Sequence, residues 1–307
     1  MQLCTFQTGD QPEVGLVHEE WVLPVQRALP QLLRAHDPML DLIARWDAVK
    51  PALQGLLDLP DPEHKLRREL LRLHAPVPRP GKVLGIGLNY LDHINEKIIG
   101  EVRTAPEHQV WFSKATTAVN GPYDPIVLPP ESVSTMTDYE AELVVVIGRR
   151  CKRVTPEQAQ AHVFGYCVGN DVSVRDWQKR TSQWTLGKGF DTHAPFGPWI
   201  TTADEVPDPH ALNLRGLVNG QERQSSNTRL MIFKIWDQIS VLSQAMTLEP
   251  GDVIYTGTCS GVGAGMTPPA FLRPGDHVRI EVERLGAIEA LCVADPGEGC
   301  PHGIRPV

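Results

Sequence analysis

Short apolar runs separated by turns dominate the chain from residue 82 onward. Runs of three to six residues recur, and Gly or Pro stands near most of their ends, at 83–86, 126–128, 143–147, 163–168, 253–255 and 278–282. Runs this short are typical of β-strands, because buried helices usually need ten or more residues. Helical spacing is confined to 156–163, 203–212 and 231–247 in this part of the chain. The pattern therefore predicts a mainly β fold with some α-helix.

The residues before 82 have a different pattern of apolar side chains. Residues 1–26 alternate as short strands around a turn at Gly9-Asp10, and residues 28–73 have apolar side chains near helical spacing. Three prolines then fall within 75–81, which favours a stiff, extended connector. We therefore expect a small α+β N-terminal domain over 1–75, a linker over 76–81, a catalytic domain over 82–295 and a tail over 296–307.

The composition of the chain excludes several partners. Its 307 residues have a formal charge of −8, and the pI is near 5.8. Nucleic acids and anionic membranes need basic surfaces, so we expect neither as a partner. The N-terminus lacks the pattern of a signal peptide, and the run at 143–147 is too short to span a bilayer. Six scattered cysteines without a C-x-x-C pair fit free thiols, and all this predicts a cytoplasmic protein.

Carboxylates gather at the ends of two apolar runs. Glu140 and Glu142 are two residues apart at the start of one run, so a strand would point both to the same face. Asp171 follows the run at 163–168. Adjacent carboxylates in a buried environment repel, and a divalent cation relieves that repulsion. Oxygen ligands favour Mg²⁺ or Mn²⁺, with Ca²⁺ possible in a crystal. The alternatives are a solvated strand end, pairing with Arg, or a helix N-cap role for Asp171.

Three other motifs are candidates for chemistry. Lys188 lies between two glycines, where the backbone can approach a ligand. His93 and Glu96 would be i,i+3 neighbours on a helix, and a carboxylate that orients an imidazole makes a general base. A Gly-rich stretch at 256–263 offers N–H groups and hydroxyls to an anion, and within it Cys259 is a candidate nucleophile without a recognisable His partner. Each has a simpler interpretation, as a surface lysine, an idle His–Glu contact or a turn.

The order of these motifs resembles that of the fumarylacetoacetate hydrolase superfamily, in its short bacterial and FAHD-like branch. The resemblance covers roughly residues 80–292 and rests on Gly-Leu-Asn-Tyr-x-x-His93-x-x-Glu96, Asp-Tyr-Glu140-x-Glu142-Leu, Gly-x-Asp171-Val-Ser-x-Arg175-Asp176, Gly-Lys188-Gly-Phe-Asp-x-x-x-Pro-x-Gly-Pro198, Asn227-Thr228 and Thr-Gly-Thr258-x-x-Gly-Val-Gly263. The family usually has Pro where this chain has Cys259.

The resemblance implies a fold and a set of roles. The fold would be a mixed β-roll catalytic domain in a homodimer, with a variable lid over 97–110 that sets specificity. Glu140, Glu142 and Asp171 would bind Mg²⁺ or Mn²⁺, and Lys188 would be a cationic partner of the substrate. His93 and Glu96 would form a catalytic dyad. The implied substrate contacts are Tyr90, Arg175, Gln178 and Thr258.

The implied reaction is metal-dependent hydrolysis of a C–C bond in an acylpyruvate-like 2,4-dioxo acid, through a metal-bound enolate, with the dyad activating water. Such substrates arise in the catabolism of aromatic compounds or sugar acids. Alternatives on the same site are oxaloacetate decarboxylation or tautomerisation, and isomerisation or hydration of a 2-hydroxy-dienoate. Alternatives of other classes are a non-catalytic 2-oxo acid binding protein and a thiol hydrolase built on Cys259.

Overall fold

A long mixed sheet runs through the molecule, and its strands confirm the predicted β-rich class. The computed structural model describes residues 1–9, 11–33, 37–58, 64–96 and 104–297. Four consecutive N-terminal strands form one end of the sheet, and later strands follow out of sequence order. The strand order is β4 (Leu66–Arg67), β3 (Trp21–Pro24), β2 (Pro12–His18), β1 (Gln2–Gln7), β14 (Ala194–Thr202), β12 (Val163–Asn170), β11 (Ala141–Ile147), β17 (Val253–Thr258), β6 (Val83–Gly87) and β7 (Val110–Ser113). Two short strands branch from this path, β5 (Arg72–His74) beside β1 and β8 (Val119–Asn120) beside β14.

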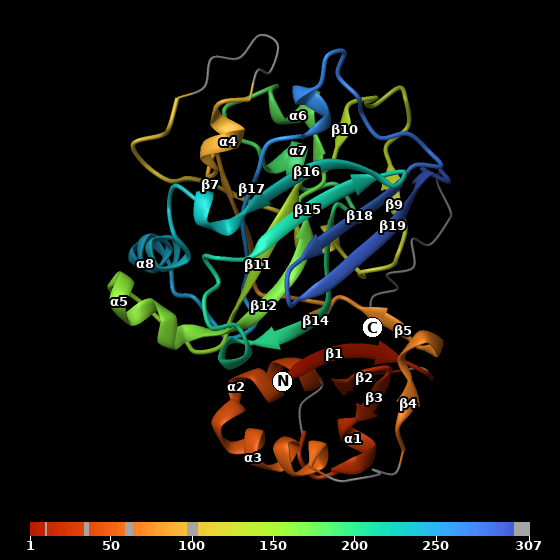
Figure 1. Cartoon of the computed structure of the whole chain (residues 1–307), viewed down its shortest axis with the longest axis vertical. Helices are drawn as coiled ribbons and strands as arrows, with labels where there is room; N and C mark the ends of the chain where they lie inside the picture. Colours follow the sequence, from red (N-terminus) through yellow and green to blue (C-terminus); the bar gives the residue numbers. More distant parts are fainter. Residues whose placement is uncertain (10, 34–36, 59–63, 97–103, 298–307) are drawn as a thin grey trace.

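A second sheet packs against the middle of the first. It has five strands, in the order β16 (Gln221–Asn227), β15 (Asn213–Val218), β18 (His277–Val282), β19 (Gly286–Ala294) and β9 (Ile126–Leu128). Buried aliphatic side chains of β11, such as Leu143 and Val145, share one hydrophobic cluster with Leu214 and Ile280 of this sheet. Figure 1 shows four strands of this layer, β15 and β16 in teal and β18 and β19 in blue, crossing in front of β11 and β12. β11 is therefore buried along its whole length, which explains its unbroken apolar run.

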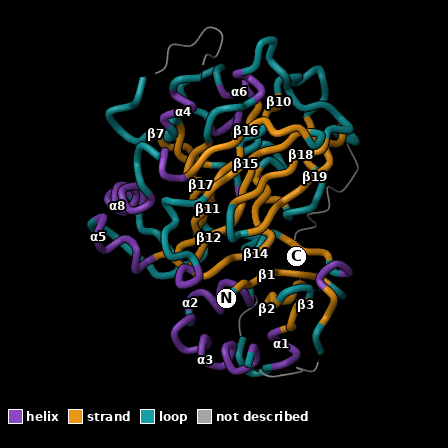
Figure 2. Tube along the Cα trace, in the orientation of Figure 1, coloured by secondary structure: helices purple, strands orange, loops and turns teal. Residues whose placement is uncertain are grey.

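Helices lie at the periphery of the two sheets (Figure 2). Predicted helices at 156–163 and 231–247 are confirmed by α5 (Pro156–Ala159), which continues as a 3-10 turn over Gln160–His162, and by α8 (Ile235–Ala245). The helix expected over 203–212 is wrong, because only Ala203–Glu205 form a 3-10 turn. Pro207 and Pro209 follow directly, and neither has the N–H that a helix would need there.

The N-terminal segment is α+β, as expected, but its helices end early. The strands predicted within 1–26 are present, with α1 (Val25–Ala28), α2 (Pro38–Ala44) and α3 (Trp46–Leu57) after them. The helical pattern expected up to residue 73 is wrong in its last part, which forms β4, a 3-10 turn (Arg68–Leu70) and β5. Pairing across β1, with Phe6 opposite Leu73, prevails there over the local helical spacing.

The N-terminal segment and the rest of the chain share one sheet and one core. Gln2 and Leu3 of β1 pair with Thr201 and Ile200 of β14. Leu3 and Leu42 belong to the same hydrophobic cluster as Phe164 and Phe196. A domain boundary at 76–81 stays a prediction, and most of the expected tail (298–307) lies outside the described residues. Within the described part of the chain, no helix is long and apolar enough to cross a membrane.

Candidate active site

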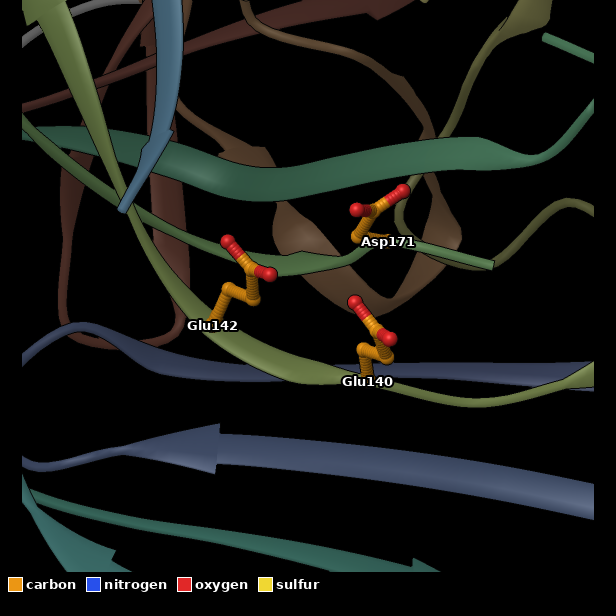
Figure 3. Close-up of side chains that lie close together, drawn as sticks. All are labelled: Glu140, Glu142 and Asp171. Atoms are coloured by element: carbon orange, nitrogen blue, oxygen red, sulfur yellow. The ribbon is translucent and has the colours of Figure 1, made fainter. Parts of the chain in front are cut away.

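Three carboxylates from two neighbouring strands meet at the start of β11. Antiparallel pairing of β11 with β12 sets Ala141 opposite Asn170, so Asp171 comes to lie beside Glu140. The Asp171 N–H donates to the Glu140 carbonyl at 3.0 Å, and the Glu140 N–H donates to the Asn170 side chain at 2.9 Å. Figure 3 shows the three side chains of Glu140, Glu142 and Asp171 turned toward one space. One oxygen of each lies within 4.8 Å of the others, and all three residues are buried.

Buried cations surround two of the three carboxylates. The Lys188 ammonium donates to Glu140 Oε2 at 2.8 Å and to Asp171 Oδ2 at 2.6 Å. Arg175 donates to Glu140 Oε1 at 2.6 Å and to Asp138 Oδ2 at 2.9 Å. Lys114 pairs with Asp171 Oδ1, and its side chain is fully buried. Lys188 and Arg175 stand at the ends of short helices, α7 (Thr185–Lys188) and α6 (Arg175–Gln178), which close the same end of the molecule in Figure 1.

The surroundings of Glu142 differ from those of Glu140 and Asp171. Burial would raise the pKa of Glu140, but Lys188 and Arg175 lower it to well below its usual range. Glu142 accepts a hydrogen bond from the Gly257 N–H at 2.8 Å, and no cation within the described residues pairs with it. Burial, together with the charges of Asp171 and Glu140, holds the Glu142 pKa well above its ordinary value. A cation beside Glu142 would remove this cost.

A divalent metal fits this donor set. With Glu142 ionised, the four buried carboxylates that the structure describes here, including that of Asp138, outnumber the three buried cations by one negative charge. A dication would reverse the sign and leave the site positive by one, which suits an anionic substrate. All the candidate ligand atoms are carboxylate oxygens, which Mg²⁺ and Mn²⁺ prefer. Glu140, Glu142 and Asp171 are the residues that could hold it.

The expected contact between His93 and Glu96 is present. His93 lies in α4 (Leu91–Ile94), is only 5% exposed, and its Nδ1 lies 2.8 Å from Glu96 Oε2. The other Glu96 oxygen accepts the Gly261 N–H at 2.8 Å, which ties the helix to the Gly-rich stretch after β17. The Glu96 carboxylate therefore orients the imidazole through Nδ1.

Two buried residues of this site escaped sequence reasoning. The motifs indicated Lys188 as the lysine of the site, whereas Lys114 is a second lysine that pairs with Asp171. The structure turns it inward because Phe112 is buried, Ser113 exposed and Lys114 buried, the alternation of β7 continued past its end, and the sequence around Lys114 does not show this. Asp138 accepts from the N–H groups of Gly263 and Ala264 at 2.7 and 3.0 Å, so it shapes the Gly-rich stretch while pairing with Arg175.

Comparison with known proteins gives this arrangement a family. The model of the fumarylacetoacetate (FAA) hydrolase C-terminal domain matches residues 82–293. The chain belongs to the fumarylacetoacetate hydrolase family. Over 225 residues it is 48% identical to a protein of Bos taurus named oxaloacetate tautomerase FAHD2A, mitochondrial, covering 73% of this chain and 70% of that protein.

Solved structures agree over nearly the whole chain. A putative HpcE protein from Mycobacterium smegmatis is 35% identical, with a TM-score of 0.84 over 96% of this chain and 99% of that one. Maleylpyruvate hydrolase from Sphingobium sp. SYK-6, in complex with manganese(II) and pyruvate, is 31% identical, with a TM-score of 0.78 and the same coverage of both chains. The N-terminal segment is thus part of the shared fold, and the chain is an enzyme of the fumarylacetoacetate hydrolase family.

The expected substrate contacts differ in how freely they can meet a ligand. Arg175 already bonds two carboxylates and Gln178 Oε1, although its Nη2 has no partner among the described residues. Thr258 donates to the Ala141 carbonyl at 3.0 Å while accepting from Gln224. The Tyr90 hydroxyl is buried and finds no partner within the described residues. Substrate contact by these side chains stays a prediction, and residues 97–103 of the expected lid lie outside the described part of this family member.

Cys259 is poorly placed as a nucleophile. It is fully buried, with the Gln224 amide nitrogen 3.7 Å from its sulfur. Burial holds the pKa of the thiol far above its usual value, which disfavours the reactive thiolate. The described cysteines are all buried free thiols, as expected, and Cys300 lies outside the described residues.

His193 should make the stability of the protein depend on pH. Its Nε2 donates to the Val127 carbonyl at 2.9 Å, which anchors the chain segment that follows Lys188. Burial lowers its pKa to about 3. The neutral ring is the folded form, so stability is complete above the unfolded pKa near 6.5 and falls as the pH drops toward 3. We expect the protonation of His193 to lower the free energy of unfolding by about 2 kcal/mol between pH 7 and pH 5.

Urea unfolding at both pH values measures this loss. His193→Gln keeps a donor for Val127 but does not titrate, so its stability should fall by about 2 kcal/mol less than that of the wild type. His18→Gln, at an exposed position, is the control and should leave the pH dependence unchanged. Equal losses in the wild type and in His193→Gln would contradict the prediction.

Proposed function

We propose that this enzyme uses Mg²⁺ or Mn²⁺, held by Glu140, Glu142 and Asp171, to act on a small anionic 2-oxo acid. The observation that carries the proposal is the buried carboxylate Glu142, which lacks a cationic partner among the described residues and adjoins two others that have them. A metal bound there would act as a Lewis acid toward the carboxylate and 2-oxo oxygens of the substrate. The manganese and pyruvate named for the Sphingobium neighbour support this choice.

The main reaction that we propose is hydrolysis of a C–C bond in an acylpyruvate-like 2,4-dioxo acid. Glu96 would hold His93 through Nδ1, and Nε2 would take a proton from water as the water oxygen adds to the distal carbonyl carbon. The bond between that carbon and C3 then breaks, giving a carboxylic acid and, once C3 is protonated, a 2-oxo acid. Lys188 and Arg175 would balance the negative charge of the site throughout.

Oxaloacetate tautomerisation is the second candidate, because a relative with that name is 48% identical to this chain. The reaction moves a proton between C3 and the 2-oxo oxygen, and it needs no water. His93 would serve as the proton carrier here too. The two candidates therefore use the same residues and differ in whether C4 of the substrate is a ketone carbon, to which water can add, or a carboxylate.

A panel of substrates tests the proposal. Acylpyruvates, fumarylpyruvate, oxaloacetate and sugar-derived 2,4-diketo acids would be assayed with Mg²⁺ or Mn²⁺ and after EDTA treatment. We expect turnover of at least one 2-oxo acid, lost with EDTA and restored by the metal, and insensitive to thiol alkylation. Ligand-induced thermal shifts without turnover across the panel would favour a binding protein, and loss of activity on alkylation alone would favour a thiol hydrolase.

A homodimer and a cytoplasmic location stay proposals, as do the absence of nucleic-acid and membrane partners. Size-exclusion chromatography with light scattering would measure the oligomeric state. The acidic net charge of −8 supports the absence of polyanionic partners.

A further inference from the structure

The Glu96 carboxylate is held at both of its oxygens by groups from different parts of the chain. Oε2 contacts His93 Nδ1, and Oε1 accepts the N–H of Gly261, each at 2.8 Å. His93 and Glu96 belong to α4 and the turn after it, whereas Gly261 lies in the stretch after β17. The position of the carboxylate therefore depends on how closely that stretch approaches α4.

Gly265 is where the approach is tightest. A methyl group on its Cα would lie 2.1 Å from Glu96 Oε1 and 2.4 Å from Glu96 Cδ, closer than atoms can pack. Gly265 ends a 3-10 turn (Gly263–Gly265), and its φ is not in the left-handed region. Its backbone would accept an alanine, so backbone conformation does not explain the glycine. The space it leaves is occupied by the Glu96 carboxylate.

The obstacle at Gly265 differs from that at its neighbour. A methyl on Gly263 would meet the backbone carbonyl of Ala270 at 2.1 Å, so that glycine serves the fold itself. At Gly265 the three nearest atoms all belong to the end of one flexible side chain. An added methyl can be accommodated if Glu96 swings away, at little cost to folding but at the expense of its contacts with His93 and Gly261.

We propose that Gly265 is a positioning residue for the His93–Glu96 pair. By having no side chain, it admits the Glu96 carboxylate to the one place where it reaches both the imidazole and the Gly261 N–H. Its effect on turnover rests on the proposed function of the pair. Its effect on the Gly261 hydrogen bond does not, because that contact exists without any substrate.

The substitution Gly265→Ala tests the inference. We expect kcat to fall about 100-fold, as for other small misplacements of catalytic groups, with little change in KM. In a Glu96→Ala background the same substitution should change kcat less than twofold, because the side chain it displaces is already gone. Gly55→Ala, which adds a methyl to open space in α3, is the control and should leave kcat unchanged.

Hydrogen exchange at the Gly261 amide gives a readout that needs no substrate. Exchange should be faster in Gly265→Ala and equally fast in Glu96→Ala, since both remove the same acceptor. If the wild type turns over no 2-oxo acid but the Gly261 amide responds in this way, the proposed function fails and the positioning role stands. An unchanged amide, or losses of kcat that multiply in the double variant, would overturn the inference.

Folding of the variants is checked by thermal unfolding. Should Gly265→Ala alone fail to fold, the double variant with Glu96→Ala should fold like Glu96→Ala, because the obstructing atoms are removed. A double variant as unstable as Gly265→Ala would mean that the glycine serves the backbone, and the inference would be wrong.

Discussion

Replacing Glu142 with Gln is expected to abolish metal binding while leaving the metal-free protein at least as stable as the wild type. The substitution removes one carboxylate from a group of three that repel one another, and Gln can still accept from the Gly257 N–H. At a concentration 100 times its Kd, Mn²⁺ should stabilise the wild type by about 2.7 kcal/mol. Loss of a direct ligand should weaken binding more than about 100-fold, so this stabilisation and the turnover of 2-oxo acids should both disappear.

Glu140→Gln is the matched control, because its carboxylate has the partners that Glu142 lacks. Removing it leaves Lys188 and Arg175 with one contact fewer in a buried site. The metal-free protein should lose about 3 kcal/mol of stability. Thermal unfolding with and without Mn²⁺ measures both variants. If Glu142→Gln destabilised the metal-free protein as much as Glu140→Gln does, the distinction drawn between the two carboxylates would be wrong.

Replacing His93 with Ala should lower kcat for hydrolysis by about 10²- to 10⁴-fold, the usual contribution of a general base. Metal affinity should be unchanged, because the residues that could hold the ion are three carboxylates and do not include His93. Steady-state kinetics on the best substrate of the panel and calorimetric titration with Mn²⁺ separate the two effects.

Asn95→Ala, two residues further along at the exposed C-cap of α4, controls for disturbance of α4 and should keep wild-type kinetics. Turnover of His93→Ala at the wild-type rate would remove this residue from the mechanism. Loss of Mn²⁺ binding in the same variant would show instead that the substitution disturbs the carboxylate site.

Sequence reasoning predicted the parts of the site that depend on local periodicity. Glu140 and Glu142 share a face because strands repeat every two residues, and His93 meets Glu96 because they are three residues apart on a helical turn. Asp171 was placed beside them by the resemblance and by its position after an apolar run. Antiparallel register then accounts for the contact.

The parts that escaped prediction depend on tertiary pairing. Lys114 reaches Asp171 across 57 positions in sequence, and no local pattern distinguishes it from a surface lysine. Residues 72 and 73 end the stretch predicted to be helical, yet they pair with β1. Local spacing could not predict the ion pairs of the site or the point where the N-terminal helices end. Both depend on contacts between segments that are far apart in the chain.

The junction of β1 with β14 bears on how this protein can be divided. β14 lies between β12 and β1, so it is an interior strand only while the first residues of the chain are present. In a fragment beginning at the proline-rich linker, we expect the part of β14 around Ile200 and Thr201 to become an unpaired edge and Phe164 and Phe196 to lose apolar neighbours. Exposed strand edges and apolar side chains favour aggregation. We therefore expect that an exchange of the N-terminal segment between relatives succeeds only if the new segment brings a strand that pairs with β14 as β1 does.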